Sequence, residues 1–471
     1  MRWFPPVLIA LLVVSGHTLG AADEDPRALA RAVLKQLVEI DTTDVRGNTT
    51  TAAEAMAARL RDAGFPADDV KVLGPEARHG NLVARFRGTG ARKPILLLSH
   101  LDVVDARRED WSAWLEPFRF IEKDGYYYGR GTTDIKDGGA ILVANLIRLK
   151  REGFRPDRDL ILALTAGEEG GHWNGVRFLL GHHRALVDAA YCVNTDGGDF
   201  QTKDGRRRLA AMQASEKLSV HFQLEVRDPG GHSSLPRPDN PIYHLSAALS
   251  RLSAFEFPVE LNEVTRVFFT RMAAIEGGAL GEDMKAAAAT PPDPAAIKRL
   301  SASPYYNALL RMTCVATRLE GGHADNALPQ TARATVNCRL LPGHAPEEAQ
   351  RALVGLVADP RIEVSRPGGP AAAENDKVAP PSTIEPELLA ALEKVAGAVW
   401  PGVPVVPTME TGGTDGYELR PAGIPTFGIS GVFIDIDDVR AHGRDERVGV
   451  ESFHEGVEFY YRLIKALSSQ R

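Results

Sequence analysis

Residue types that bind metal ions recur directly after short apolar segments of the sequence. Two imidazoles and several carboxylates suit zinc, which accepts nitrogen and oxygen donors where thiolates are lacking. The three cysteines show no CxxC spacing, so a thiolate zinc site is excluded. Each residue taken alone is more often an ordinary surface residue, so the prediction depends on their joint position at segment ends. The candidate ligands are His100, Asp134, Glu169, Asp196 and His442.

Two further carboxylates lie beside candidate ligands. Glu168 directly precedes Glu169, and adjacent carboxylates can divide the tasks of binding a metal and taking the proton of an attacking water. Asp102 lies two residues after His100 and could accept the second ring N–H, which would fix the tautomer. We therefore expect one of Glu168 and Glu169 to be the catalytic base and Asp102 to support His100.

A sheet has to bring these residues together. Four short segments are apolar on both faces and alternate with helical patterns, which predicts buried strands of an α/β fold. Ligands bind beyond the carboxyl ends of such strands, so we expect the candidate ligands to converge at one sheet edge. The predicted strands are 81–86, 95–98, 160–165, 189–194 and, later, 425–429. The predicted helices are two within 26–64, then 138–150, 175–181, 385–399 and 451–467.

A second pattern begins near residue 217, where apolar and polar residues alternate as in an antiparallel strand with one wet face. Its order of strand, helix, strand, strand, helix and strand is that of a ferredoxin-like unit. We expect an α/β catalytic domain with a mixed central sheet in two pieces, 23–212 and 368–471, around an inserted lid or dimerisation domain, 213–367. Within the insert, the Ala- and Pro-rich residues 256–308 are expected to be helical. Residues 367–381 are interpreted as a linker.

Five motifs occur in one order along the chain. They are Ser99-His100-Leu101-Asp102-Val103-Val104, Gly129-Arg130-Gly131 with Asp134-Ile135-Lys136, Gly167-Glu168-Glu169-Gly170, Gly230-Gly231-His232-Ser233-Ser234 and Ala441-His442-Gly443. In these motifs the sequence resembles the zinc metallopeptidase family that includes glutamate carboxypeptidase, carnosinase, aminoacylase and succinyl-diaminopimelate desuccinylase. One departure is Asp137, where the family usually has glycine. The resemblance also implies a cis peptide bond at Asp134–Ile135.

The resemblance implies a role for each candidate ligand, and it implies that Glu168 is the catalytic base. Asp134 would bridge two zinc ions, one bound also by His100 and Asp196 and the other by Glu169 and His442. The residue types follow from coordination chemistry, whereas this pairing rests on the family. Cobalt or manganese could replace zinc, because sites of nitrogen and oxygen donors accept several such metals.

Other residues resemble substrate-contacting positions of the family. His232 would stabilise the oxyanion across a homodimer, unless it is only a turn histidine. Arg339 would bind a substrate carboxylate, unless it forms a structural salt bridge, and Asn326 would contact substrate, unless it only caps a turn. Gly413 and Thr414 would line the site from a glycine-rich loop.

Three functions remain open at this point. The first is a carboxypeptidase or dipeptidase acting on peptides with a free C-terminus. The second is an N-acyl-amino-acid amidohydrolase, and the third is a binding protein that has lost catalysis. The presence of every candidate ligand and of Glu168 disfavours the third.

Composition and the N-terminal segment restrict where the protein works. The net charge is −7, and no long Lys/Arg run indicates nucleic-acid binding; we interpret Arg206-Arg207-Arg208 as a solvated turn. Residues 1–22 have a positive start, an apolar core and a small-residue exit, which predicts a cleaved secretory signal and a secreted or periplasmic protein without a membrane anchor. Cys192, Cys314 and Cys338 are too few for a disulfide framework, and we interpret each as a small buried hydrophobe.

Overall fold

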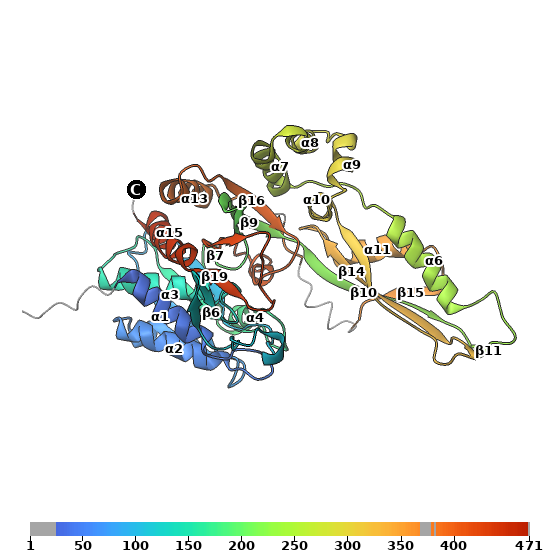
Figure 1. Ribbon diagram of the computed structural model, residues 1–471, viewed down its shortest axis with the longest axis horizontal. Helices are drawn as coiled ribbons and strands as arrows, with labels where there is room; N and C mark the ends of the chain where they lie inside the picture. Colours follow the sequence, from blue (N-terminus) through green and yellow to red (C-terminus); the bar gives the residue numbers. More distant parts are fainter. Residues whose placement is uncertain (1–24, 368–377, 381–382, 470–471) are drawn as a thin grey trace, which may run out of the picture.

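A computed structural model gives the arrangement of residues 25–367, 378–380 and 383–469 (Figure 1). The predicted signal at 1–22 lies outside the described residues, as does most of the predicted linker at 367–381. Within the described part of the chain, no helix is long and apolar enough to cross a membrane.

A mixed sheet of ten strands forms the centre of the larger domain, in the order β1-β2-β6-β3-β7-β17-β9-β8-β18, with β16 also paired to β9. Strands β6, β3, β7 and β17 run parallel to one another, whereas β2 is antiparallel to β6. The predicted mixed sheet is therefore confirmed. Its strands are β1 (Val70–Leu73), β2 (Asn81–Phe86), β3 (Ile95–His100), β6 (Leu160–Thr165), β7 (Tyr191–Asn194), β8 (Phe200–Lys203), β9 (Arg206–Glu216), β16 (Val405–Glu410), β17 (Thr426–Gly428) and β18 (Phe433–Asp435).

Both faces of this sheet are covered, which explains why its central strands are apolar at every position. Along β3, Ile95 and Leu97 join one core, and Leu96 and Leu98 join another on the opposite face. The first core is covered by α1 (Pro26–Val38), α2 (Thr49–Asp62), α3 (Lys136–Arg151), α13 (Pro386–Val399) and α15 (Val450–Ser468). The second is covered by α4 (Gly175–His182), α5 (Arg184–Val187) and α14 (Gly416–Leu419).

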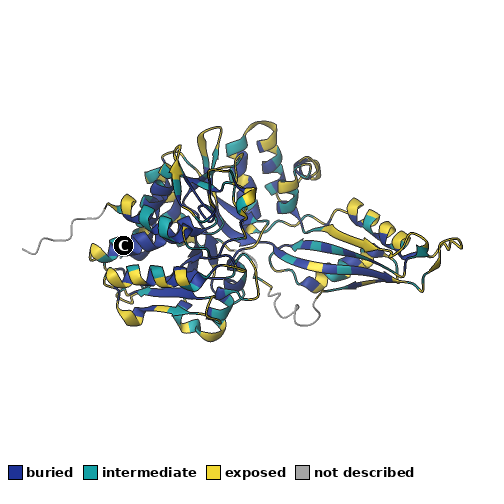
Figure 2. Cartoon of the chain, turned by 60° about the horizontal axis from the view of Figure 1, so that its bottom comes forward, coloured by how far each residue is buried: buried dark blue, intermediate teal, exposed yellow. Residues whose placement is uncertain are grey.

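A smaller sheet extends from the larger domain, as Figures 1 and 2 show. Its antiparallel strands have the order β15-β10-β14-β12, and α6 and α11 pack on one face, so the predicted ferredoxin-like arrangement is present. This unit, which we call the lid, has its own apolar core. Its elements are β10 (Leu218–Arg227), α6 (Pro241–Ala254), β12 (Thr313–Gly321), β14 (Thr331–Leu340), α11 (Pro346–Val357) and β15 (Ile362–Ser365), with the short pair β11 (Gly231–His232) and β13 (Ala327–Leu328).

The helices between α6 and β12 differ from expectation in where they pack. Residues 256–308 are largely helical as predicted, but their apolar side chains, such as Phe269 and Met284, join the first core of the larger domain. The expected insert 213–367 therefore contains a segment that packs away from the lid. These helices are α7 (Glu263–Glu276), α8 (Gly278–Ala288), α9 (Pro294–Leu300) and α10 (Pro304–Leu310).

Several strands were not predicted from the sequence. The interpretation of Arg206-Arg207-Arg208 as a turn is wrong: they begin β9, and Arg207 and Arg208 pair with Glu455 and Glu276. A further small sheet, in the order β19-β5-β4, lies beside the site. Its strands are β4 (Ile121–Lys123), β5 (Tyr126–Tyr128) and β19 (Arg447–Gly449).

The prediction that all three cysteines are unpaired is also wrong. Cys314 and Cys338 face each other across β12 and β14 and form a disulfide, whereas Cys192 is free and buried as expected. The disulfide links β12, the edge strand of the lid, covalently to its neighbour β14.

Candidate metal centre

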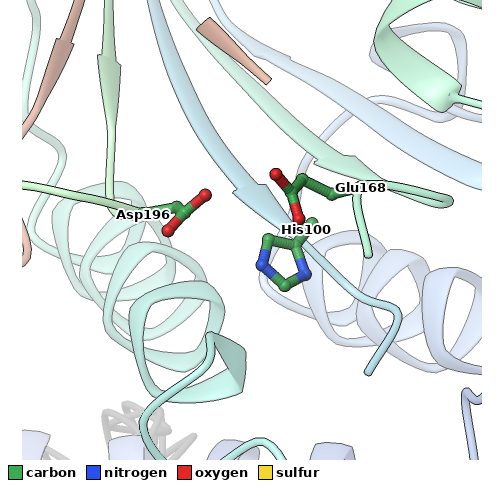
Figure 3. Close-up of side chains that lie close together, drawn as sticks. All are labelled: His100, Glu168 and Asp196. Carbon is green, nitrogen blue, oxygen red and sulfur yellow. The ribbon is translucent and has the colours of Figure 1, made fainter. Parts of the chain in front are cut away.

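Three neighbouring parallel strands deliver candidate ligands to one edge of the sheet. His100 is the last residue of β3 and is in register with Thr165, the last residue of β6. Glu168 and Asp196 follow the ends of β6 and β7 by a few residues. Figure 3 shows Glu168 and Asp196 on either side of the His100 ring, as expected from the strand ends.

Two loops that lie far apart in the sequence, one with Asp134 and one with His442, complete the cluster. Asp134 precedes α3, and its two carboxylate oxygens contact different imidazoles: Oδ1 lies 3.2 Å from His100 Nε2, and Oδ2 lies 2.9 Å from His442 Nε2. His442 Nε2 also lies 2.9 Å from Glu169 Oε1. One carboxylate between two imidazoles is the arrangement expected of a bridging ligand. The Asp134–Ile135 peptide bond is cis, as the family resemblance implied.

The donor set fits divalent cations. Ligand atoms of His100, Glu168 and Asp196 lie within 4.8 Å of one another, as do those of His100, Asp134 and Glu169. His100 Nδ1 lies 2.9 Å from the main-chain oxygen of Asp102, which assigns the ring proton to Nδ1. Among the described residues, His100 Nε2 is buried without a hydrogen-bond partner, so its lone pair faces the carboxylates. This is the disposition of a metal-binding imidazole.

The electrostatics of the cluster point the same way. Burial raises the pKa of Glu168 to about 10, and the nearby carboxylates of Asp196 and Asp415 raise it further against the opposing effect of His100. Hydrogen bonds to Asp134 and Glu169 raise the pKa of His442 to about 10. Carboxylates outnumber imidazoles here, and without cations the cluster retains protons; bound cations would take the place of these protons.

The contacts of Asp102 correct one detail of the sequence-based expectation. Its carboxylate was expected to accept the second N–H of His100, but that N–H is directed to the Asp102 main-chain oxygen, and the carboxylate oxygen lies 3.8 Å from Nδ1. The carboxylate instead accepts the main-chain N–H of Glu168 at 3.2 Å and of Glu169 at 2.9 Å. Asp102 therefore holds the loop of the candidate base as well as His100.

Asp415 is a buried carboxylate near the cluster that the sequence did not reveal. It accepts hydrogen bonds from the Thr165 hydroxyl at 2.9 Å and the Asn174 amide at 2.8 Å, and so braces the turn after β6. Burial raises the pKa of Asp415 to about 6. Asp137, the departure from the family pattern, is buried at the start of α3 and accepts the N–H of Gly138 at 2.8 Å.

A cavity of about 1240 Å³ opens beside the cluster, and Asp134, Asp196, Gly413 and Thr414 line it. Thr414 donates its N–H and its hydroxyl to the buried Glu216 carboxylate, at 2.8 and 2.9 Å. The structure thus places the predicted glycine-rich loop at the site.

Two predicted contacts lie elsewhere within one chain. His232 is on β11 at the far end of the lid in Figure 1, and it is exposed. Asn326 lies next to it, where its main-chain oxygen accepts the N–H of Ser233 at 3.0 Å. The structure therefore brings His232 and Asn326 together but not to the candidate metal centre of the same chain.

Arg339 lies at the other end of the lid. It is on β14, paired with Ser219 directly after the crossover from β9 to β10. Burial lowers the pKa of this half-buried guanidinium. Within the described part of the chain, no carboxylate forms a salt bridge with it, so the alternative of a structural salt bridge finds no support.

Comparisons with known proteins agree with this geometry. The sequence profile of peptidase family M20/M25/M40 matches residues 96–466. The chain is 28% identical to human N-fatty-acyl-amino acid synthase/hydrolase PM20D1 over 380 residues, which covers 79% of this chain and 74% of that protein. It is 28% identical to probable carboxypeptidase S-like 2 of Dictyostelium discoideum over 404 residues, covering 82% and 74%. The fold is similar to that of the M20 family metallo-carboxypeptidase Sso-CP2 from Sulfolobus solfataricus, with a TM-score of 0.67, 17% identity and coverage of 93% and 99%.

Proposed function

Since the chain belongs to peptidase family M20/M25/M40 and is a hydrolase, we propose that it uses two zinc ions to cleave an amide bond next to a free carboxylate. The observation that carries the proposal is the position of Asp134 between His100 and His442, with the Glu169 carboxylate on the second imidazole. Such a cluster, next to a cavity and at the strand ends of the sheet, supports metal-dependent hydrolysis.

The metals would be held by the residues predicted from the sequence. Asp134 would contact both ions, His100 and Asp196 the first, and Glu169 and His442 the second. When bound, two such ions lower the pKa of water and polarise the carbonyl group of the substrate. Cobalt or manganese would suit the same donors.

Glu168 would be the general base. It lies beside His100 and Asp196 and is not needed to complete the proposed ligand set. Its carboxylate would take a proton from the attacking water and give it to the leaving nitrogen. Asp102 would keep Glu168 and Glu169 facing different partners, because it accepts the main-chain N–H of both.

The substrate carboxylate would bind to Arg339. A half-buried guanidinium without a carboxylate partner among the described residues is suited to two parallel hydrogen bonds from a ligand. Its position next to the crossover between the domains would let it reach a substrate when the lid closes. Gly413 and Thr414 would contact the same substrate from the cavity wall.

A carboxypeptidase or dipeptidase is the first candidate, and an N-acyl-amino-acid amidohydrolase is the second. Both cleave an amide next to an amino acid with a free carboxylate. The second gains from the similarity to N-fatty-acyl-amino acid synthase/hydrolase PM20D1, and the first from the similarity to carboxypeptidase S-like 2. A catalytically inactive binding protein is least supported, because the geometry keeps Glu168 inside the cluster.

A homodimer would account for the position of His232. Strand β12 is an exposed edge of the lid sheet, with Val315 and Leu319 58% and 67% exposed. A second copy could cover such an edge. The partner's lid would then bring His232 and Asn326 to the site, where His232 would stabilise the oxyanion. Light scattering tests this, and a fully active monomer would contradict it.

An exported location is proposed from the sequence and supported by the lid disulfide. Disulfides persist in oxidising compartments, so the Cys314–Cys338 disulfide agrees with an exported location. Mass spectrometry of the secreted or periplasmic protein should find a mature N-terminus close to residue 23. A chain that retains residues 1–22 in the cytoplasm would contradict it.

The proposed reaction is tested with matched substrates on the metal-loaded protein. Dipeptides, N-terminally blocked peptides and N-acyl amino acids of increasing chain length are compared, each with its C-terminal methyl ester. Hydrolysis of a free acid but not of its ester supports the proposal, and the best acyl group decides between the two candidates. Zinc-loaded protein that cleaves none of these amides would contradict both.

A further inference from the structure

Glu446 is a buried carboxylate outside the five motifs of the sequence. It lies four residues after the candidate ligand His442, and its side chain is 0% exposed. No catalytic step in the proposed reaction uses it. Its contacts nevertheless lead to two of the candidate metal ligands.

The carboxylate accepts five hydrogen bonds from the loop that ends at Asp134. Oε1 accepts the N–H of Thr133 at 2.9 Å, its hydroxyl at 3.1 Å and the N–H of Asp134 at 3.3 Å. Oε2 accepts the N–H of Gly131 at 3.0 Å and the Arg130 Nη1 at 2.7 Å. Three of these donors are main-chain groups, so Glu446 fixes the course of the loop rather than one side chain of it.

The same carboxylate reaches His442 through Arg130. The guanidinium is 3% exposed, and its Nη2 donates to the main-chain oxygen of His442 at 3.4 Å. His442 has a φ of 60°, a left-handed conformation that residues with side chains seldom adopt. A residue in that conformation needs neighbours that hold it there.

An isolated structural ion pair does not explain this arrangement. Arg130 alone would neutralise Glu446, and the main-chain N–H groups of residues 131, 133 and 134 would not be needed. Attraction to the ligands does not explain it either, because Asp134 carries the same charge as Glu446. What the contacts share is that each restrains a loop ending in a candidate ligand.

We propose that Glu446 is a positioning residue that sets the directions of Asp134 and His442 together. It does so through the main-chain N–H groups and the Thr133 hydroxyl of the loop that ends at Asp134, and through Arg130 on the His442 carbonyl. This inference rests on the proposed function, because it assumes that these two side chains bind metal. Carboxylates that orient ligands in this way typically change metal affinity 10- to 100-fold when replaced.

The test compares Glu446→Gln with a matched control, Asp157→Asn. Asp157 is also a buried carboxylate, 4% exposed, and it binds the Arg92 guanidinium at 2.9 Å. It lies just before the start of β6, whereas the candidate ligands lie at the other end of that strand. Both variants lose a buried charge paired with arginine, but only Glu446 contacts a ligand loop. Zinc affinity is measured on metal-stripped full-length protein by competition with a chelating dye, and thermal unfolding is followed alongside.

In Glu446→Gln, the weaker-binding of the two zinc ions is expected to bind about 10- to 100-fold less tightly than in the wild type. Hydrolysis lost at low free zinc should return as free zinc is raised. Asp157→Asn should unfold at lower temperature yet bind zinc like the wild type. If the wild type and Glu446→Gln bind zinc equally, the positioning role is wrong while the proposed function stands. If the wild type binds no zinc, the proposed function itself fails.

A milder variant covers the case in which Glu446→Gln does not fold. Thr133→Val keeps the Glu446 charge and removes one hydrogen bond to it. Loss of one such bond should weaken zinc binding about fivefold. Unchanged zinc affinity in folded Thr133→Val would overturn the inference.

Discussion

Glu168 and Glu169 are adjacent carboxylates to which we assign different tasks, and replacing each by glutamine separates these tasks. Glu169 Oε1 lies 2.9 Å from His442 Nε2, and Glu169 groups with His100 and Asp134. Glu168 groups with His100 and Asp196 instead. Glutamine has nearly the same shape as glutamate, so each variant removes charge and basicity without opening a cavity.

The expected sizes follow from these tasks. Loss of a general base lowers the rate by about 10²- to 10⁴-fold, so Glu168→Gln should lose that much kcat and still bind both metals. Glu169→Gln should bind the metal on His442 at least about 10-fold less tightly, with activity that depends on free zinc. Because burial disfavours the charge of Glu168, Glu168→Gln should not lower the unfolding temperature of metal-stripped protein.

Metal content by mass spectrometry, together with kcat at fixed free zinc, measures both expectations. The wild type and Asp157→Asn serve as controls for loading and folding. The assignment is refuted if Glu168→Gln loses a metal while Glu169→Gln keeps two. It is also refuted if Glu168→Gln hydrolyses substrate at the wild-type rate.

Three further predictions concern the lid and its junction with the larger domain. Arg339→Met should raise KM about 10- to 100-fold for free acids, because a charged hydrogen bond to the substrate carboxylate is lost; an unchanged KM would contradict carboxylate binding. Burial lowers the pKa of Lys217 to about 7, with a further effect of Arg339. The unfolded chain then holds more protons than the folded chain between about pH 7 and 10, and stability rises with pH there. Between pH 7 and 9, the free energy of unfolding measured in urea should rise by about 2 kcal/mol more in the wild type than in Lys217→Met. The same pH dependence in both proteins would contradict this prediction. Replacing both Cys314 and Cys338 by serine, which opens a loop of sequence separation 24, should destabilise the lid by about 3 kcal/mol. Thiol titration of denatured wild type should find only Cys192, and three reactive thiols would contradict the disulfide.

Elements whose surroundings are the same along their whole length were predicted correctly from the sequence. The strand 160–165 matches β6 because both of its faces are buried, and such burial requires a continuous apolar run. Strand β9 was missed because it begins with charged residues whose partners, such as Glu455, come from distant helices. Residues 256–308 were predicted to be helical, but which core their helices join depends on a surface that forms only in three dimensions.

The convergence of the candidate ligands was predictable because residue types that bind metals follow the strand ends, whereas their assignment to two metals rests on the family resemblance. Asp102 shows the limit of spacing: a residue two positions after His100 offers both a carboxylate and a main-chain oxygen, and only the backbone path decides between them. Glu446 and Asp415 gave no signal, since their donors lie hundreds of residues away in sequence. The Cys314–Cys338 pair depended on the register of two strands.

An anomalous difference map at the zinc absorption edge tests most directly whether two metals share Asp134. Crystals of zinc-loaded protein should show two peaks at the ends of β3, β6 and β7. One peak should contact His100 and Asp196, the other Glu169 and His442, and both Asp134. A single peak, or peaks that do not contact Asp134, would contradict the account.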